Sequence, residues 1–482
     1  ACIYNINADY APLAWEFNNT YYSEWFIGDV MSDDALKGGQ NISDMAAAYE
    51  LENFKSNADN EIAEEYFKAQ YEGIARCNTS LTYIPTVPCD SDMNESLKQR
   101  LLGEAYFLRA YYYFRLVRAY GGVPLSLSIE NDDSQWDRAR SSKEVIYAQI
   151  ISDLENAESR LWNKSETSGA DMGRATKGAA QAMLMKVYMY MHEYAKAKEW
   201  GDKFLQDQAA EYSLAPDFAS NFTIAGENNE ESIFEIQYAN EATSDYGSGN
   251  GSTRGTFTQV LTRSRSTNMG DEGWGFNKPT HNLYNEYEEA DSLRRDATII
   301  LLDSAHLGEQ DTYLGTSYLN RKTGLYNADG TGYTYKNAHN TRGVLNNKQY
   351  RLADFYLLYA EACLGIGDAS TATIYLNKVR TRVGLPTYPG YTFKVNGEEI
   401  TSPTLEEAIR HERRMELAME GHRWFDLCRW GVAYEVMTAY MALESSEAKA
   451  EMQPFKKGVH ELLPIPNKQR QLNPSLTQNP GY

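Results

Sequence analysis

The sequence predicts a mainly α-helical protein with one long loop-rich insertion that contains a few short strands. Amphipathic segments with apolar residues three and four positions apart dominate the chain, a pattern typical of helices that pack on one face. Two of these segments, residues 59–78 and 94–120, follow each other closely and form a predicted helix pair. Residues 207–348 differ in composition from the helical segments, because they are rich in Gly, Asn, Ser, Thr and Tyr. We therefore expect a rigid helical base that carries long loops.

The predicted helices recur as helix–turn–helix units. The first unit places small and large apolar residues at the spacing of the tetratricopeptide repeat: Leu102, Gly103, Tyr106, Ala110, Phe114 and Pro124. A second pair is predicted at about residues 142–162 and 175–191, and a third copy at 349–382. Because long insertions separate these copies, we interpret them as a scaffold and not as a tandem solenoid.

Strand and turn signals gather in two loop-rich segments. Residues 232–238 are predicted to form a strand, and residues 385–403 lead into a hairpin with its turn at Asn396-Gly397. The expected organisation is a single domain over residues 1–482. Its helical scaffold spans about 1–206, 349–382 and 404–440, and its loop-rich insertion spans about 207–348.

Composition and charge exclude several classes of protein. The chain has 46 basic and 67 acidic residues and a net charge of −21, which argues against binding to nucleic acid or anionic lipid. Its 36 Tyr against 16 Phe favour surfaces that are both apolar and hydrogen-bonding, as in carbohydrate recognition. No segment reaches the roughly 18 apolar residues of a membrane helix. No signal peptide is visible, and the first residues read as the inside of a helix, so we interpret the N-terminus as trimmed.

Neither cysteine nor histidine spacing indicates a metal or a cofactor, and we expect none. The five cysteines include no C-x-x-C pair; Cys77 and Cys89 flank a proline-containing loop and form either one disulfide or two free thiols. His411 precedes a glutamate as in a zinc protease helix, but Met415 stands where the second histidine is required. Residues 327–332 begin like a calcium loop without its later acidic ligand, so we expect a simple turn.

Residues 405–431 concentrate charged side chains among large apolar ones. Glu412, Glu416 and Glu420 are four residues apart and therefore share one helix face. Gly421 is placed to end or kink this helix. The cluster is either an acid/base site or a structural ion-pair network. We favour the network, because buried ion pairs also bring acids and bases together.

The same stretch resembles the signature of a known family. It reads Glu-Arg-x-x-Glu-Leu at residues 412–417, Glu-Gly at 420–421 and Arg-x-x-Asp-Leu-x-Arg-Trp-Gly at 423–431. This is similar to the signature of the SusD/RagB-like outer-membrane glycan-binding proteins. Other segments resemble the same family in chain order: residues 108–125, 145–157, 273–296, 463–466 and 473–482.

The resemblance implies a fold and a function. The fold is an all-α scaffold of four tetratricopeptide-like helix pairs with a loop-rich subdomain. The function is that of a non-catalytic, cell-surface lipoprotein of the outer membrane, which captures a polysaccharide or oligosaccharide and delivers it to a TonB-dependent SusC-like transporter. The family's lipoprotein signal is missing at the start of this sequence, so the lipid is not assigned to Cys2.

The family signature is framework, so we expect the ligand-binding residues in the loops. Sugar recognition needs flat aromatic faces and planar polar groups that pair with hydroxyls. For Trp25 and Trp274, packing in the core is the alternative to an exposed platform. The candidates are Trp25, Asp33 and Asp34 near the N-terminus, Asn78 and Tyr83 around the 77–93 loop, Arg265, Asn268, Trp274 and Phe276 in the central loop, and Tyr313 and Tyr335 beyond it.

Two other functions compete with glycan capture. A glycoside hydrolase on a helical frame would need two carboxylates about 5–10 Å apart, and nothing in the sequence marks such a pair. A peptide-binding tetratricopeptide scaffold would have tandem repeats with an exposed concave face, which the long insertions argue against.

Overall fold

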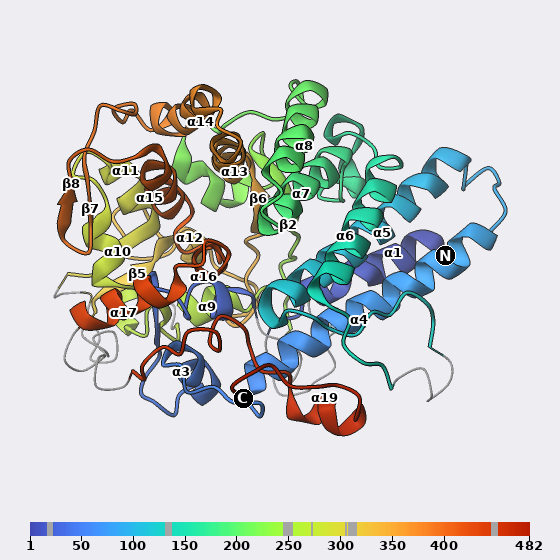
Figure 1. Cartoon of the computed structure of the whole chain (residues 1–482), viewed down its shortest axis with the longest axis horizontal. Helices are drawn as coiled ribbons and strands as arrows, with labels where there is room; N and C mark the ends of the chain where they lie inside the picture. The colour runs from blue at the N-terminus through green and yellow to red at the C-terminus, as the bar shows by residue number, and fades with distance from the viewer. Residues whose placement is uncertain are drawn as a thin grey trace.

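Helices dominate the computed structural model of the chain, which confirms the mainly α fold class (Figure 1). The structure describes residues 1–16, 23–130, 137–243, 254–270, 273–303, 306, 316–444 and 452–482. The α-helices are α1 Cys2–Tyr10, α2 Trp25–Gly28, α3 Ala46–Glu52, α4 Glu61–Tyr83, α5 Glu95–Tyr120, α6 Lys143–Glu158, α7 Lys177–Tyr190, α8 Tyr194–Asp207, α9 Thr258–Thr262, α10 His281–Glu286, α11 Ser292–Thr298, α12 Arg321–Gly324, α13 Leu352–Gly365, α14 Ala369–Arg382, α15 Leu405–Leu417, α16 Arg423–Arg429, α17 Ala433–Leu443 and α19 Asn467–Leu472.

Short 3₁₀ helices and strands connect the α-helices. The 3₁₀ helices are η1 Ala11–Ala14, η2 Ile84–Thr86, η4 Lys164–Glu166, η5 Gly169–Asp171, η6 Phe218–Phe222, η7 Ile224–Gly226 and η8 Thr267–Met269. The strands are β1 Ala35–Gly38, β2 Ser232–Ile236, β3 Phe276–Pro279, β4 Ile299–Leu301, β5 Tyr318–Asn320, β6 Asn347–Arg351, β7 Phe393–Val395 and β8 Glu398–Ile400. They pair two by two and antiparallel, as β1–β3, β2–β6, β4–β5 and β7–β8.

The long helices pack against their neighbours in sequence order. Helices α4, α5, α6, α7 and α8 each contact the next, and α13 then packs on α7 and α8 before it meets α14 and α15 (Figure 1). This arrangement is consistent with the predicted helix–turn–helix units. The predicted strand at 232–238 and the hairpin at Asn396-Gly397 are confirmed as β2 and β7–β8. The division into scaffold and insertion stays a prediction.

Polar caps fix where the scaffold helices begin. A side-chain oxygen at the N-cap accepts a backbone N–H bond from the first turn, which satisfies a donor that the helix itself leaves unpaired. Among the helices of 13 or more residues that the structure describes, six begin in this way, with Asn60 before α4, Asn94 before α5, Ser142 before α6, Thr176 before α7, Asp368 before α14 and Thr404 before α15.

One large hydrophobic core joins the scaffold to the C-terminal segment, from Leu13 to Leu476. Close helix contacts depend on glycine within it. A Cβ on Gly73 of α4 would lie 2.3 Å from the ring of Tyr112 on α5, so a larger residue would force the helices apart. All five cysteines are free thiols, which resolves the choice that the sequence left open for Cys77 and Cys89.

Candidate functional site

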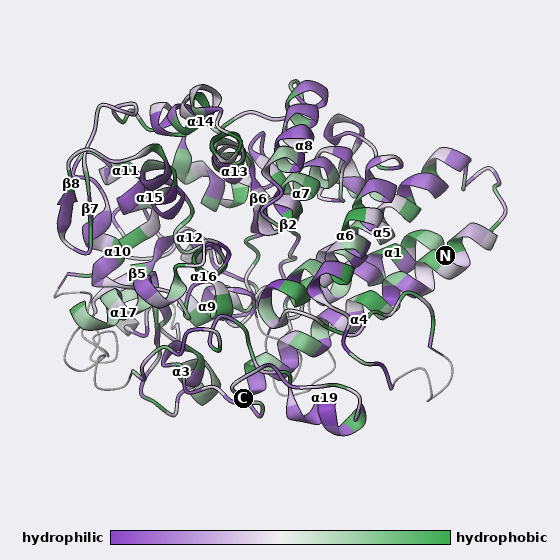
Figure 2. Cartoon of the chain, in the orientation of Figure 1, coloured by the Kyte–Doolittle hydropathy of each residue, from purple (hydrophilic) through white to green (hydrophobic). Residues whose placement is uncertain are grey.

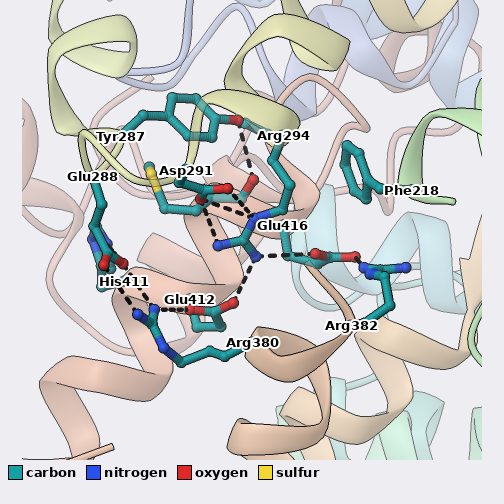
Figure 3. A network of polar contacts seen from close by, with 12 residues as sticks. Phe218, Tyr287, Glu288, Asp291, Arg294, Arg380, Arg382, His411, Glu412 and Glu416 are labelled. Atoms are coloured by element: carbon teal, nitrogen blue, oxygen red, sulfur yellow. Dashed lines mark hydrogen bonds and ion pairs between the residues drawn. The ribbon is translucent and has the colours of Figure 1, made fainter. Parts of the chain in front are cut away.

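The 405–431 stretch forms a buried charged framework, as the sequence favoured. Helix α15 is hydrophilic along most of its length in Figure 2, yet most of its side chains are buried. Figure 3 shows Arg294 of α11 at the centre, fully buried among three carboxylates. Its guanidinium lies 2.6 Å from Asp291 Oδ2, 2.6 Å from Glu412 Oε1 and 3.1 Å from Glu416 Oε2. Helices α11 and α15 are therefore held together by charge as well as by apolar contacts.

Further arginines extend this framework to strand β6 and helix α14. Arg351 Nη1 lies 2.5 Å from Glu416 Oε1, and Arg382 pairs with the same carboxylate. Arg351 Nη2 also lies 2.8 Å from Glu420 Oε1, to which Lys322 Nζ donates at 2.7 Å. Burial alone would raise the pKa of Glu420, but Arg351 and Lys322 outweigh it and hold that pKa at about 2. The carboxylates of Glu416 and Glu420 thus stay ionised and paired, as expected of a structural ion-pair network.

Asp33 and Asp34 belong to this framework. Asp33 accepts bonds from Arg423 at 2.8 and 2.9 Å, and Arg414 Nε donates to Asp34 Oδ1 at 2.8 Å. Both aspartates are buried. Burial opposes the ionisation of Asp33, but Arg414 and Arg423 lower its pKa to about 2. The geometry directs these two carboxylates toward arginines and not toward solvent.

Trp25 packs against the core and borders a cavity. Its side chain is 5% exposed, and its ring stacks on Phe26 with centroids 3.8 Å apart. The indole Nε1 donates to Thr258 Oγ1 at 3.1 Å. The ring is therefore not an open platform, although one part of it lines the polar cavity formed with α9 and β6.

Asn78 and Tyr83 lie on the last turns of α4 but face different surroundings. Asn78 is buried, and its Oδ1 accepts a bond from Arg109 Nη1 at 2.9 Å. Tyr83 is 54% exposed at the end of the helix. Of this pair, only Tyr83 is exposed to solvent and available to a ligand.

The central loop brings three predicted residues together. Arg265 Nε donates to the carbonyl oxygen of Trp274 at 2.7 Å, and its guanidinium lies 6.0 Å from the ring centre of Phe276. Trp274 is partly buried and packs edge-to-face on Phe257, with centroids 5.3 Å apart. Phe276 is buried in β3. Arg265 also pairs with Asp44. This ion pair connects the central loop to the loop before α3.

The remaining candidates do not join this group as closely. Asn268 is exposed in η8, and its backbone N–H donates to Ser266 Oγ at 3.3 Å. Tyr335 is partly buried against Leu325, Val344 and Leu345. Tyr313 lies outside the described residues.

A polar loop next to Arg265 was not among the residues predicted from the sequence. Gln40, Asn41 and Ser43 are exposed there, and Asn41 Oδ1 accepts from Ser43 N and Asp44 N at 3.0 and 3.1 Å. The signal for a turn was present, since Gly38-Gly39 precedes these polar residues and both glycines have positive φ. We call Asp44, Arg265, Trp274 and Phe276 the Arg265 cluster.

The Arg265 cluster links the partly exposed Trp274 to the loop that carries the exposed side chains of Gln40, Asn41 and Ser43. Such a surface suits a neutral polyhydroxylated ligand, because amides both donate to and accept from hydroxyls. Among the described residues, no group of three or more His, Cys, Asp or Glu side chains is arranged to hold a metal ion.

Two family models match separate parts of the chain, one toward each end. The model of the SusD family matches residues 294–482, and a model described as "Starch-binding associating with outer membrane" matches residues 9–189. The chain belongs to the SusD-like family. The first of these matches contains residues 405–431, which supply Glu412, Glu416 and Glu420 to the charged framework.

Curated relatives of this SusD-like chain have low sequence identity, but the alignments cover most of the chain. A SusD-like protein of Bacteroides ovatus is 29% identical over 388 residues, which are 75% of this chain and 64% of that protein. The chain therefore spans less than two thirds of that relative. SusD-like protein P2 of Formosa agariphila is 27% identical over 447 residues, 90% of this chain and 83% of the relative.

Solved structures share the fold over its whole length. A laminarin binding SusD-like protein superposes with a TM-score of 0.81 at 29% identity, covering 100% of this chain and 99% of the other. Surface glycan-binding protein A from Bacteroides fluxus gives a TM-score of 0.83 at 25% identity with the same coverage.

Proposed function

We propose that this SusD-like chain is a non-catalytic surface protein that captures a polysaccharide or oligosaccharide. One observation carries the proposal: the fold matches that of a laminarin binding SusD-like protein from end to end, at 29% identity. Surface glycan-binding proteins from Bacteroides fluxus and Bacteroides uniformis, both 25% identical, have the same fold. These relatives are described as binding proteins and not as enzymes.

The Arg265 cluster is the proposed contact surface for the glycan. Trp274 supplies a partly exposed ring, and the bond from Arg265 to its carbonyl oxygen fixes its backbone. The exposed side chains of Gln40, Asn41 and Ser43 lie on the loop before α3. The ion pair between Asp44 and Arg265 holds this loop next to the central loop. A sugar ring would cover the indole while its hydroxyls pair with these polar groups.

The proposal includes delivery to a TonB-dependent SusC-like transporter and anchoring at the outer membrane by a lipid. The family model matched at residues 9–189 carries a description that names association with the outer membrane. In the described part of the chain, no helix has both the length and the apolar character needed to cross a bilayer. Co-purification with a SusC-like transporter from the same organism would test the first part, and failure to co-purify in either ligand state would contradict it.

Affinity electrophoresis on a panel of polysaccharides, with laminarin and starch included, tests glycan capture. Retarded migration without released sugar supports a binding protein, whereas released oligosaccharide contradicts the non-catalytic proposal. Trp274→Ala is expected to weaken retention by roughly 5- to 140-fold, because about 1–3 kcal/mol of contact with the sugar is lost. Trp200→Ala is the matched control, since Trp200 is also partly buried but lies on α8. Equal retention by both variants would refute the assignment of Trp274.

A further inference from the structure

A polar cavity lies between α9, α12, β3, β6 and the turn after α15, apart from the Arg265 cluster. Its volume is about 70 Å³. Since a water molecule needs about 10–15 Å³ by this measure, the cavity has room for roughly five waters or for one edge of a small ligand. Six amide side chains line it: Asn221, Gln259, Asn277, Asn346, Asn347 and Gln349.

Two of these amides are buried with one polar atom unpaired. Gln259 is 1% exposed; its Oε1 accepts a bond from Val344 N at 2.7 Å, and its Nε2 has no partner among the described residues. Asn277 is 1% exposed; its Nδ2 donates to Asp29 Oδ2 at 3.2 Å, and its Oδ1 is unpaired in the same part of the chain. Because the other end of each amide is engaged, its orientation is set. The cavity is thus left with one free donor and one free acceptor, each of which costs about 1–3 kcal/mol when it stays unpaired.

The charged groups at the cavity are already compensated. Glu420 pairs with Lys322 at 2.7 Å, Glu24 pairs with Arg115 at 3.1 Å, and Lys348 pairs with Glu235. A charged ligand would therefore find no unpaired counterion and would lose its hydration. A neutral ligand avoids this cost.

We propose that this cavity is a second binding site, which takes the hydroxyl-bearing edge of a neutral sugar or polyol. A hydroxyl group accepts from Gln259 Nε2 with its oxygen and donates its hydrogen to an acceptor such as Asn277 Oδ1. Asn347 and Gln349 are partly exposed and line the same cavity, so the rest of the sugar ring extends toward them. Gln349 Oε1 accepts from Tyr111 and Arg115, which leaves its amino group for the ligand. The site is separate from the proposed capture of polysaccharide and does not depend on it.

Saturation-transfer NMR and calorimetry with small probes test this site. The neutral probes are glycerol, D-glucose, D-galactose and D-mannose, and the charged probes are D-glucuronate and D-glucosamine. We expect at least one neutral probe to bind, and each charged probe to bind at least tenfold more weakly than that neutral sugar. Absence of binding by all four neutral probes, or equal binding of the charged ones, overturns the proposal.

Two variants place the bound probe in the cavity. Gln259→Glu keeps the acceptor for Val344 and replaces the free donor by an oxygen, so binding should weaken about tenfold. Gln208→Glu is the control, because Gln208 is equally buried at the end of α8 but does not line the cavity. If thermal unfolding shows that Gln259→Glu does not fold, Asn347→Ala takes its place, since Asn347 is partly exposed. Unchanged probe binding in the folded variant overturns the assignment.

Polysaccharide retention separates this site from the proposed function. Gln259→Glu is expected to keep polysaccharide retention while it loses the small probe. If the wild-type protein binds the probe but retains no polysaccharide, glycan capture fails and the second site stands. If the wild-type protein retains polysaccharide but binds no probe, the second site fails and glycan capture stands.

Discussion

Replacing Arg294 with methionine removes the cation at the centre of the charged framework. Asp291, Glu412 and Glu416 would then lose a partner within 3.1 Å, and Arg294 itself has no exposed surface through which water could replace it. Breaking a buried ion pair by removing one partner costs about 3–5 kcal/mol, and methionine fills much of the volume without restoring the charge. We therefore expect Arg294→Met to destabilise the fold by about 3–5 kcal/mol.

Thermal unfolding converts this free energy into a measurable shift. The unfolding entropy is about 2.1 cal/mol/K per residue, or about 1 kcal/mol/K for 482 residues. If the chain unfolds as one unit, Tm falls by about 3–5 °C. Arg295→Met is the matched control, since Arg295 is adjacent on α11 and pairs with the mostly exposed Asp296, a contact of about 0–1 kcal/mol. Equal Tm shifts in the two variants would refute the idea that the buried network stabilises the fold.

Three further predictions concern the same framework. Glu420 has a folded pKa of about 2 against an ordinary value of about 4.3, so its stabilising contribution is present above the ordinary pKa and is lost as pH falls from about 4.5 to 2; acid titration followed by circular dichroism should show unfolding in that window, and a protein equally stable at pH 2 and pH 6 would contradict it. His411 is buried with Glu286 and Glu288 each within 3.6 Å, and although burial opposes its charge, these carboxylates raise its pKa above 6.5. Its contribution is therefore full below pH 6.5 and is lost as pH rises through the folded pKa. Urea unfolding from pH 6 to 9 should show this loss in the wild type and not in His411→Gln. Finally, a Cβ on Gly28 would lie 2.1 Å from the carbonyl oxygen of Gly421, so Gly28→Ala should destabilise the fold by about 1–3 kcal/mol in urea unfolding, against little change for the looser Gly390→Ala.

Local patterns predicted the helical elements well. The segments predicted at 59–78 and 94–120 correspond to α4 and α5, and those at 142–162 and 175–191 to α6 and α7. Apolar periodicity and polar N-caps act within a few residues, so they are readable without the fold. The turn at Asn396-Gly397 was predictable for the same reason.

Site residues were harder to predict, because exposure depends on contacts between distant segments. Asp33 and Asp34 are residues of the type that binds sugars, yet Arg414 and Arg423, nearly 400 residues away in sequence, donate to Asp34 Oδ1 and to Asp33. Asn78 is engaged in the same way, because Arg109 donates a hydrogen bond to its side-chain oxygen. Trp274 and Trp25 carry the same indole ring, and only the packing makes the first partly exposed and the second buried.

The sequence by itself determined the helices, the family resemblance and the presence of a dense charge cluster at 405–431. Spacing along one chain is enough for these features, since they depend on helix periodicity and on local residue order. Tertiary structure alone decided which charges meet. Arg294, Arg351 and Arg382 come from three separate elements to the carboxylate of Glu416, and burial makes each of these pairs costly to break. It also decided that two amides from β3 and α9 share a cavity with unpaired polar atoms, a relation that no sequence pattern contains.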